Sequence, residues 1–249
     1  MSEDRPEPLQ PVDEDWDRAL VVVAHPDDVE FGAAAAVARW TGQGKTVVYV
    51  MVTSGEAGID GLHPDECRVV REAEEVESAR IVGVDVVEFL GFPDGVVEAT
   101  VALRAAIAEQ VRRHRPDVVV TMNHHDTWGG ASVNQADHVA VGRATIHAVQ
   151  DAGNRWVHRD QLVDGLEPWG GVREVLVAAS PASGHAVDTT DTFAQGVASL
   201  EAHRAYVAGL GWADVDAATF LAGMSRGTGA RLGTEHAAPF ERITTGFDA

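Results

Sequence analysis

The chain has 249 residues, of which 45% are hydrophobic and 23% are charged, a length that can bury the core of one large α/β domain. Its net charge of −20 argues against nucleic acid or an anionic membrane surface as a partner. One cysteine, Cys67, excludes an internal disulfide framework and a multi-cysteine zinc site. No apolar run approaches the roughly 18 residues that a membrane span needs, and no signal segment precedes the first strand, so we expect a cytoplasmic protein.

The first 18 residues are expected to form a flexible acidic tail. They carry three prolines and seven carboxylates with almost no apolar side chain. The remaining residues, 19–249, contain no internal repeat and no linker long enough to divide them, and we expect them to form a single domain.

Short continuous apolar runs predict five strands that are buried on both faces: Ala19–Ala24, Thr46–Val52, Val86–Leu90, Asp117–Thr121 and Glu174–Ala178. Helix-like stretches lie between them: Phe31–Trp40, Glu66–Val82, Thr100–Arg115 and Asp137–Asp151. This alternation predicts an α/β fold of the Rossmann-like type, with a mostly parallel sheet and helices on both faces. One more amphipathic helix is expected around Phe193, Leu200 and Val207, and the Gly- and Ala-rich remainder predicts no clear element.

The turn after the first expected strand carries His25-Pro26-Asp27-Asp28, and no glycine-rich nucleotide-binding motif occurs in the chain. Ligands of open parallel sheets bind beyond the carboxyl ends of the strands. His25 and Asp28 are three residues apart and could converge there on Zn²⁺ or Fe²⁺, with Asp27 facing a metal-bound water. The alternative is that one of the aspartates simply caps the next helix.

A third ligand is needed, and the segment after the fourth expected strand offers His138 on the same edge of the sheet. His138 would lie in the first turn of the next helix. The alternative is that Asn134 caps this helix, with Asp137 in its first turn, and His138 lies at the surface. Both can hold together, because the cap would fix the turn that aims His138.

Taken together, these segments resemble the PIG-L (LmbE-like) family of zinc-dependent N-deacetylases over roughly residues 19–210. The resemblance rests on an ordered set of segments: Ala24–Asp28 with Glu30 and Gly32, Thr53–Gly58, Arg71 with Glu74, Val82–Val84, Gly91–Gly95 and Asp137–His138.

The resemblance implies that zinc is held by His25, Asp28 and His138 and that Asp27 is the general base. It implies hydrolysis of an N-acyl group, usually acetyl, from an amino sugar or related glycoconjugate by a zinc-bound water. Two neutral imidazoles and one carboxylate would leave the ion net positive, so its bound water could reach a pKa near 7.

The resemblance also assigns the substrate side of the site. Arg71 and Asp94 match positions that contact the polar substrate in such enzymes. Trp128, on the loop before His138, could stack on a sugar face or could anchor the loop. The substrate would be a small molecule, and a homo-oligomer is left open.

One departure from the family concerns the segment Gln135-Ala136-Asp137-His138, where His-Pro-Asp-His is common. The first histidine of that motif helps to stabilise the oxyanion and is positioned by the aspartate. Gln135 can donate a hydrogen bond but supplies neither a proton nor a positive charge. Either Asp27 alone moves the proton or another histidine substitutes, and the candidates are His124, His125 and His185.

Three functions are therefore compared. The leading one is a metal-dependent N-deacetylase. The second is a sugar-conjugate-binding protein of the same fold that has little or no activity because of Gln135. The third is an Fe²⁺ oxygenase with the same two-His-one-carboxylate set, which the expected fold disfavours, since such oxygenases usually have a β-sandwich scaffold.

Overall fold

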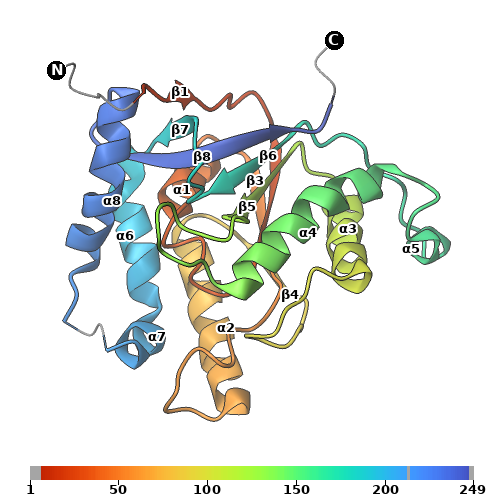
Figure 1. The fold of residues 1–249 in the computed structure, drawn as a ribbon, viewed down its shortest axis with the longest axis horizontal. Helices are drawn as coiled ribbons and strands as arrows, with labels where there is room; N and C mark the ends of the chain where they lie inside the picture. The colour runs from red at the N-terminus through yellow and green to blue at the C-terminus, as the bar shows by residue number, and fades with distance from the viewer. Residues whose placement is uncertain (1–6, 212–213, 247–249) are drawn as a thin grey trace.

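The computed structural model describes residues 7–211 and 214–246, and eight strands within them form one sheet with helices on both faces (Figure 1). The strands are β1 (Gln10–Pro11), β2 (Arg18–Val23), β3 (Thr46–Met51), β4 (Val86–Phe89), β5 (Val118–Met122), β6 (Glu174–Ala178), β7 (His185–Asp188) and β8 (Ala237–Thr244). The helices are α1 (Ala34–Gly42), α2 (Pro64–Ile81), α3 (Val101–His114), α4 (Ala136–Gly153), α5 (Arg159–Val163), α6 (Phe193–Ala202), α7 (Arg204–Gly209) and α8 (Ala217–Leu232), with a 3₁₀ turn at Thr190–Thr192.

The order of the strands across the sheet is β1-β7-β8-β6-β5-β2-β3-β4. The five strands β6-β5-β2-β3-β4 are parallel to one another, whereas β8 is antiparallel to both β6 and β7. Successive strands are added on one side of β2 as far as β4, and then on its other side from β5 onward. This is the strand order of doubly wound Rossmann-like folds, whose ligands bind where the order reverses. The expected α/β fold is confirmed, and its switch point lies between β2 and β5.

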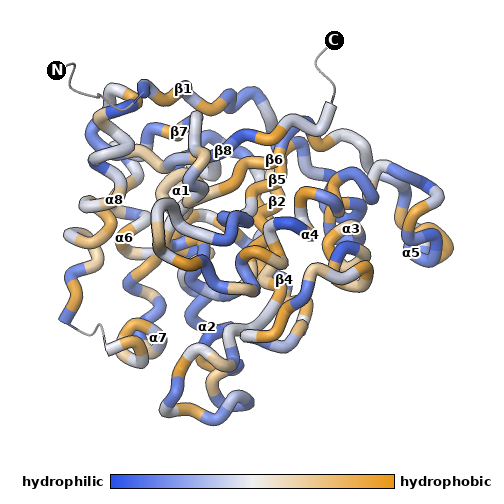
Figure 2. The backbone as a smooth tube through the Cα atoms, viewed as in Figure 1, coloured by the Kyte–Doolittle hydropathy of each residue, from blue (hydrophilic) through white to orange (hydrophobic). Residues whose placement is uncertain are grey.

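Successive residues of the parallel strands place their side chains in two apolar layers, one on each face of the sheet. Val21 belongs to the layer covered by α1 and α2, which contains Trp40, and Leu20 belongs to the layer covered by α3 and α4, which contains Ile107. The orange, hydrophobic segments in Figure 2 are accordingly concentrated along the central strands. Because both faces are buried, these strands have continuous apolar runs, and the sequence predicts them well.

The segment before β2 differs from expectation. Leu9, Val12 and Trp16 are buried, and β1 pairs in parallel with β7. Lys45 Nζ donates to the backbone carbonyls of Glu14 and Trp16, at 2.6 and 2.8 Å, and so ties the segment to the loop before β3. The expected acidic tail is therefore not found over residues 7–18, and residues 1–6 lie outside the described part of the chain. Three buried apolar side chains, the pairing of β1 with β7 and the hydrogen bonds from Lys45 together fix this segment.

The carboxyl-terminal part contains elements that the sequence did not predict. The expected helix around Leu200 is divided at His203 into α6 and α7. The Gly- and Ala-rich remainder forms α8 and the long strand β8, which pairs with both β6 and β7. Pro239 and the charged pair Glu241-Arg242 interrupt the apolar pattern of β8, which hides the strand in the sequence.

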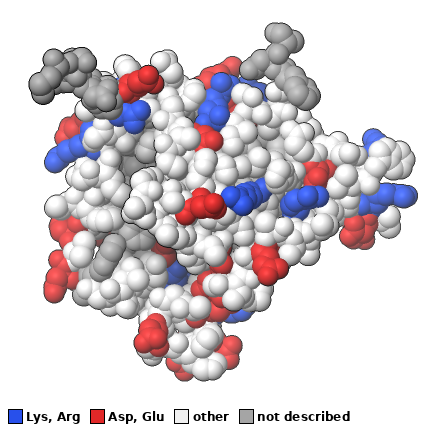
Figure 3. All heavy atoms as spheres, in the orientation of Figure 1, with Lys and Arg blue, Asp and Glu red and all other residues white. Residues whose placement is uncertain are grey.

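Helices long and apolar enough to cross a bilayer are absent from residues 7–211 and 214–246. On the face of the molecule shown in Figure 3, basic and acidic side chains are interspersed.

The buried position of Trp16 predicts a large effect of its removal. Its ring is 5% exposed and meets that of Trp40 edge to face, with the ring centroids 5.3 Å apart. We expect Trp16→Ala to lower the free energy of unfolding by about 3 kcal/mol, the usual cost of emptying an aromatic site in a core. Urea denaturation measures this, with Trp156→Ala as the matched control because Trp156 is 71% exposed. Equal small effects of the two changes would show that this segment does not pack as described.

Candidate active site

The turn between β2 and α1 presents three polar side chains at the switch point of the sheet. Asp27 adopts a φ of +87°, which is unusual for a residue with a side chain. Such conformations cost about 1–3 kcal/mol each, and residues that adopt them cluster at functional sites. Two carboxylates hold the turn: Asp28 Oδ2 accepts the His25 backbone N–H at 2.8 Å, and Glu75 Oε2 accepts the Asp27 backbone N–H at 3.2 Å. The helix-cap alternative is not found, because α1 begins six residues later, at Ala34, without a side-chain cap.

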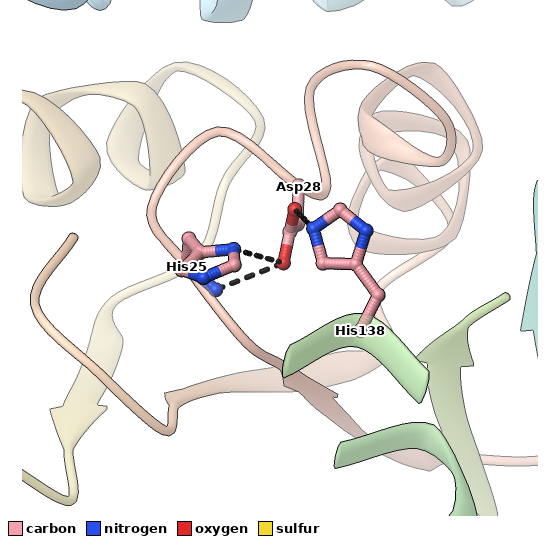
Figure 4. Close-up of side chains that lie close together, drawn as sticks. All are labelled: His25, Asp28 and His138. Carbon is pink, nitrogen blue, oxygen red and sulfur yellow. Dashed lines mark hydrogen bonds and ion pairs between the residues drawn. The ribbon is translucent and has the colours of Figure 1, made fainter. Parts of the chain in front are cut away.

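His25, Asp28 and His138 come together, as Figure 4 shows. His138 enters from the first turn of α4, and its Nε2 lies 3.1 Å from Asp28 Oδ1. His25 Nδ1 lies 3.6 Å from Asp28 Oδ2. One ligand atom from each residue lies within 4.8 Å of the other two, so these three side chains could hold one metal ion. Two imidazoles and a carboxylate are a donor set that suits Zn²⁺ or Fe²⁺.

The second ring nitrogen of each histidine faces an oxygen atom. His25 Nε2 lies 3.0 Å from Asp94 Oδ1 and 3.4 Å from Asp137 Oδ2. His138 Nδ1 lies 3.0 Å from Asn134 Oδ1. Metal-binding histidines commonly donate their other N–H to such an acceptor, which fixes the ring and its tautomer.

The electrostatics of the three residues favour a positive charge between them. Burial lowers the pKa of His25, but the carboxylates of Asp28 and Asp137 outweigh burial and raise it well above its usual value. Burial would raise the pKa of Asp28, but His138 and His25 hold it well below its usual range. Either a proton or a metal ion can supply this positive charge.

Asp27 forms a buried ion pair with Arg71, a residue of α2. Arg71 Nη2 donates to Asp27 Oδ2 at 2.6 Å and to the Pro26 carbonyl at 2.5 Å, and the two side chains are 1% and 7% exposed. The guanidinium lies 3.6 Å from the centre of the Tyr206 ring. Burial raises the pKa of Asp27 to about 6, against the opposing effect of the Arg71 charge. The structure thus places Arg71 against Asp27, with its Nε and Nη1 unpaired within the described residues.

Gln135 caps α4 through its side-chain carbonyl. Its Oε1 accepts the backbone N–H groups of Asp137 and His138, at 3.0 and 3.2 Å. This is the role that the sequence suggested for Asn134, and it sets the direction of the rest of the side chain. The Gln135 Nε2 group lies 3.4 Å from His25 Nε2, and Gln135 lines the cavity described below.

Asp137 is fully buried and acts as an anchor for the loop after β4. Its two oxygens accept the backbone N–H groups of Gly95 at 2.7 Å and Val97 at 3.0 Å. Asp94, in the same loop, also accepts the Ala57 N–H at 2.8 Å. These bonds bring the segments after β3, β4 and β5 to one place.

A cavity of about 680 Å³ opens beside these residues. The polar residues that line it are His25, Asp27, Asp28, Arg71, Asp94, Gln135 and His138. Aromatic and apolar side chains line much of the rest, among them Trp128, Tyr206, Phe220 and Met224. The ring centroid of Trp128 lies 5.6 Å from that of His138. The histidines suggested as substitutes for Gln135, namely His124, His125 and His185, are not among the residues that line the cavity.

Several residues of the site were not found from the sequence. Glu75 could have been, since it lies four residues after Arg71 and on the same side of α2. Tyr206, Phe220 and Met224 come from α7 and α8, whose place beside the cavity depends on the unpredicted course of the carboxyl-terminal chain.

The fold and the site define a Rossmann-like α/β protein with a His-Asp-His cluster at its switch point. A family model described as GlcNAc-PI de-N-acetylase (PIG-L) matches residues 20–149, which is more than half of the chain. The chain belongs to the PIG-L family.

One relative is similar in sequence, and two solved structures share the fold. The diacetylchitobiose deacetylase of Thermococcus kodakarensis is 32% identical over 156 residues, covering 62% of this chain and 57% of that protein, so the chain spans little more than half of that relative's length. The solved N,N′-diacetylchitobiose deacetylase of Pyrococcus horikoshii shares the fold, with a TM-score of 0.85 and 23% identity over 93% of this chain and 85% of that one. A 4-carboxy-2-hydroxymuconate hydratase from Pseudomonas putida also shares it, with a TM-score of 0.73 and 18% identity over 94% of this chain and 98% of that one.

The contact between Gly55 and Arg71 leads to a prediction on stability. Gly55 has a φ of +63°, and a Cβ there would lie 2.7 Å from Arg71 Nε and Nη2. Gly44 has a φ of +86° with open space around it, so Gly44→Ala should cost only the backbone term, about 1–2 kcal/mol. We expect Gly55→Ala to cost about 3 kcal/mol more, because it displaces Arg71 from a buried carboxylate. Chemical denaturation of the two variants tests this, and equal losses would contradict it.

Proposed function

We propose that this protein is a metal-dependent N-deacetylase that hydrolyses the acetamido group of an amino sugar or glycoconjugate. The observation that carries the proposal is the convergence of His25, Asp28 and His138 beside the buried carboxylate of Asp27, in the lining of a cavity. The fold alone does not decide the reaction, since a hydratase shares it. Membership of the PIG-L family and the similarity to a diacetylchitobiose deacetylase support this reaction in particular.

His25, Asp28 and His138 are proposed to hold the metal ion, and Zn²⁺ is the ion that we favour, with Fe²⁺ as the alternative. The fit rests on the donor set, on the oxygen partners of the second ring nitrogens and on the demand for positive charge between the three residues. When bound, the ion supplies Lewis-acid polarisation of the amide carbonyl and increases the acidity of a water molecule.

Asp27 is proposed as the general base and then as the acid. Its carboxylate lines the cavity and would accept the proton of the attacking water and pass it to the departing amine nitrogen. Arg71 is a positioning residue for this step, because its Nη2 holds Asp27 Oδ2 in place. Burial and the charge of Asp27 raise the pKa of Tyr206, so the neighbouring hydroxyl keeps its proton.

Gln135 is proposed to donate a hydrogen bond from Nε2 to the carbonyl oxygen as negative charge develops on it. Capping of α4 occupies its Oε1, which leaves the amino group to face the cavity. A neutral amide can stabilise an oxyanion in this way, although it cannot supply a proton. The proton therefore has to come from Asp27.

The rest of the cavity suits a sugar that carries an apolar or aromatic group. Trp128 and Tyr206 offer ring faces on which a pyranose can stack. Asp94 lines the cavity and offers an acceptor for hydroxyl groups, whereas the Nε and Nη1 atoms of Arg71 are buried.

The role of Asp27 can be separated from metal binding. We expect Asp27→Asn to lower kcat/KM for acetate release from an N-acetylglucosaminide by about 10²–10⁴-fold, the usual contribution of a general base. Its metal content by elemental analysis should stay at that of the wild type, whereas His138→Ala should lose both metal and activity. Asp85→Asn, at an exposed aspartate before β4, is the matched control. Wild-type turnover in Asp27→Asn would rule out Asp27 as the base.

The role of Gln135 distinguishes the deacetylase from a sugar-binding protein without activity. We expect Gln135→Leu to lower kcat by about 10²-fold with little change in KM, because one oxyanion donor is lost. Thr100→Val controls for the loss of a helix cap, since the Thr100 hydroxyl caps α3 by accepting the Leu103 N–H at 3.2 Å. The binding-protein hypothesis predicts the opposite result: ligand binding without acetate release in the wild type, and a gain of activity in Gln135→His.

A further inference from the structure

A second cluster of metal-ligating side chains lies outside the cavity. His124 and His125 follow β5, and Glu241 lies on β8, the antiparallel neighbour of β6. One ligand atom from each residue lies within 4.8 Å of the other two. We propose that His124, His125 and Glu241 form a second, exchangeable site for a divalent transition-metal ion.

The geometry of the cluster suits such an ion. His125 Nε2 lies 2.9 Å from Glu241 Oε2, and the ring centroids of His124 and His125 are 4.2 Å apart with 32° between their planes. An ion pair between His125 and Glu241 would explain the first contact. It would leave unexplained the buried Nδ1 of His124, which has no hydrogen-bond partner within the described residues. Two imidazoles and one carboxylate are preferred ligands of Zn²⁺, Ni²⁺ and Cu²⁺.

The three side chains are fixed by their surroundings before any ion arrives. Ser180 Oγ donates to Glu241 Oε2 at 2.6 Å and orients the carboxylate. The His125 backbone N–H donates to Asn123 Oδ1 at 3.0 Å. α4 packs directly on His124, because a Cβ at Gly142 would lie only 2.8 Å from His124 Cβ. A preformed ligand set loses little conformational entropy when it binds an ion.

The cluster can also be reached from the solvent. The side chains of His125 and Glu241 are 36% and 19% exposed, so an ion can enter and water can complete its coordination.

The second cluster is joined to the first by one side chain. Asn134 Nδ2 donates to the His125 carbonyl at 2.9 Å, while Asn134 Oδ1 lies 3.0 Å from His138 Nδ1. An ion at the second site would tie the loop of residues 123–135 to β8, and this loop carries Trp128 as well as Asn134. The site is thus built to hold in place the loop that forms one side of the cavity.

Equilibrium dialysis against Zn²⁺ tests the proposal with four forms of the full chain. We expect two ions per chain in the wild type, one in Glu241→Gln, one in His138→Ala and none in the double variant. Glu241→Gln keeps the shape of the side chain and an acceptor for Ser180, which protects the fold. His147→Ala, at an exposed histidine of α4, is the matched control and should retain two ions. One ion in the wild type with no loss in Glu241→Gln, or two ions in Glu241→Gln, would overturn the second site.

A spectroscopic measurement identifies the ligands independently of activity. Cu²⁺ bound to His138→Ala should give an electron paramagnetic resonance spectrum with coupling to two imidazole nitrogens, and His124→Ala in the same background should show one. Coupling to two nitrogens in both forms would overturn the assignment of His124. A failure of the proposed deacetylase site would be recognised separately. In that case His138→Ala would bind as much zinc as the wild type.

Discussion

The site depends on one buried ion pair, that between Arg71 of α2 and Asp27 of the turn after β2. A carboxylate enclosed to this degree would be protonated or would disrupt the fold without a partner, and breaking such a pair costs several kcal/mol. The pair also fixes an unfavourable backbone conformation at Asp27, with Glu75 bonded to the same residue. Gly55 leaves the space that Arg71 occupies, and Tyr206 covers the guanidinium. Four separate segments of the chain therefore determine where one carboxylate lies.

Around this pair, the topology of the sheet decides which side chains can meet. β2 and β5 are adjacent although about 100 residues separate them, and their carboxyl ends deliver Asp28 and His138 to the same point. Asp137, the neighbour of His138, extends the arrangement by holding the backbone of the loop after β4. Asp137 thus joins the segments that follow β4 and β5. The departure at Gln135 fits the same arrangement, since its carbonyl caps α4 and its amino group lies 3.4 Å from His25 Nε2.

The sequence predicted those parts of the molecule whose local pattern and tertiary environment agree. The strands β2, β3, β5 and β6 are buried on both faces, so their apolar runs are continuous, and His25 and Asp28 closely follow the first of them. Residues 7–18 were misjudged because three buried side chains are dispersed among many carboxylates. β8 was missed because its pattern is broken by Pro239 and by the adjacent charged residues Glu241 and Arg242. The apolar wall of the cavity, with Phe220 and Met224, was missed with it, because α8 is positioned by contacts distant in sequence.

The place of β8 in the sheet has a consequence for the order in which the fold can be completed. β1 pairs with β7, and β7 reaches the parallel sheet through β8, which is the last of the described strands to leave the ribosome. The amino-terminal strand is made first, yet the strand that connects it to the sheet is made last. Its pairing therefore has a long sequence separation and belongs to the end of folding rather than to the beginning. During synthesis the parallel strands β2 to β6 can therefore assemble before β1 is joined to the sheet.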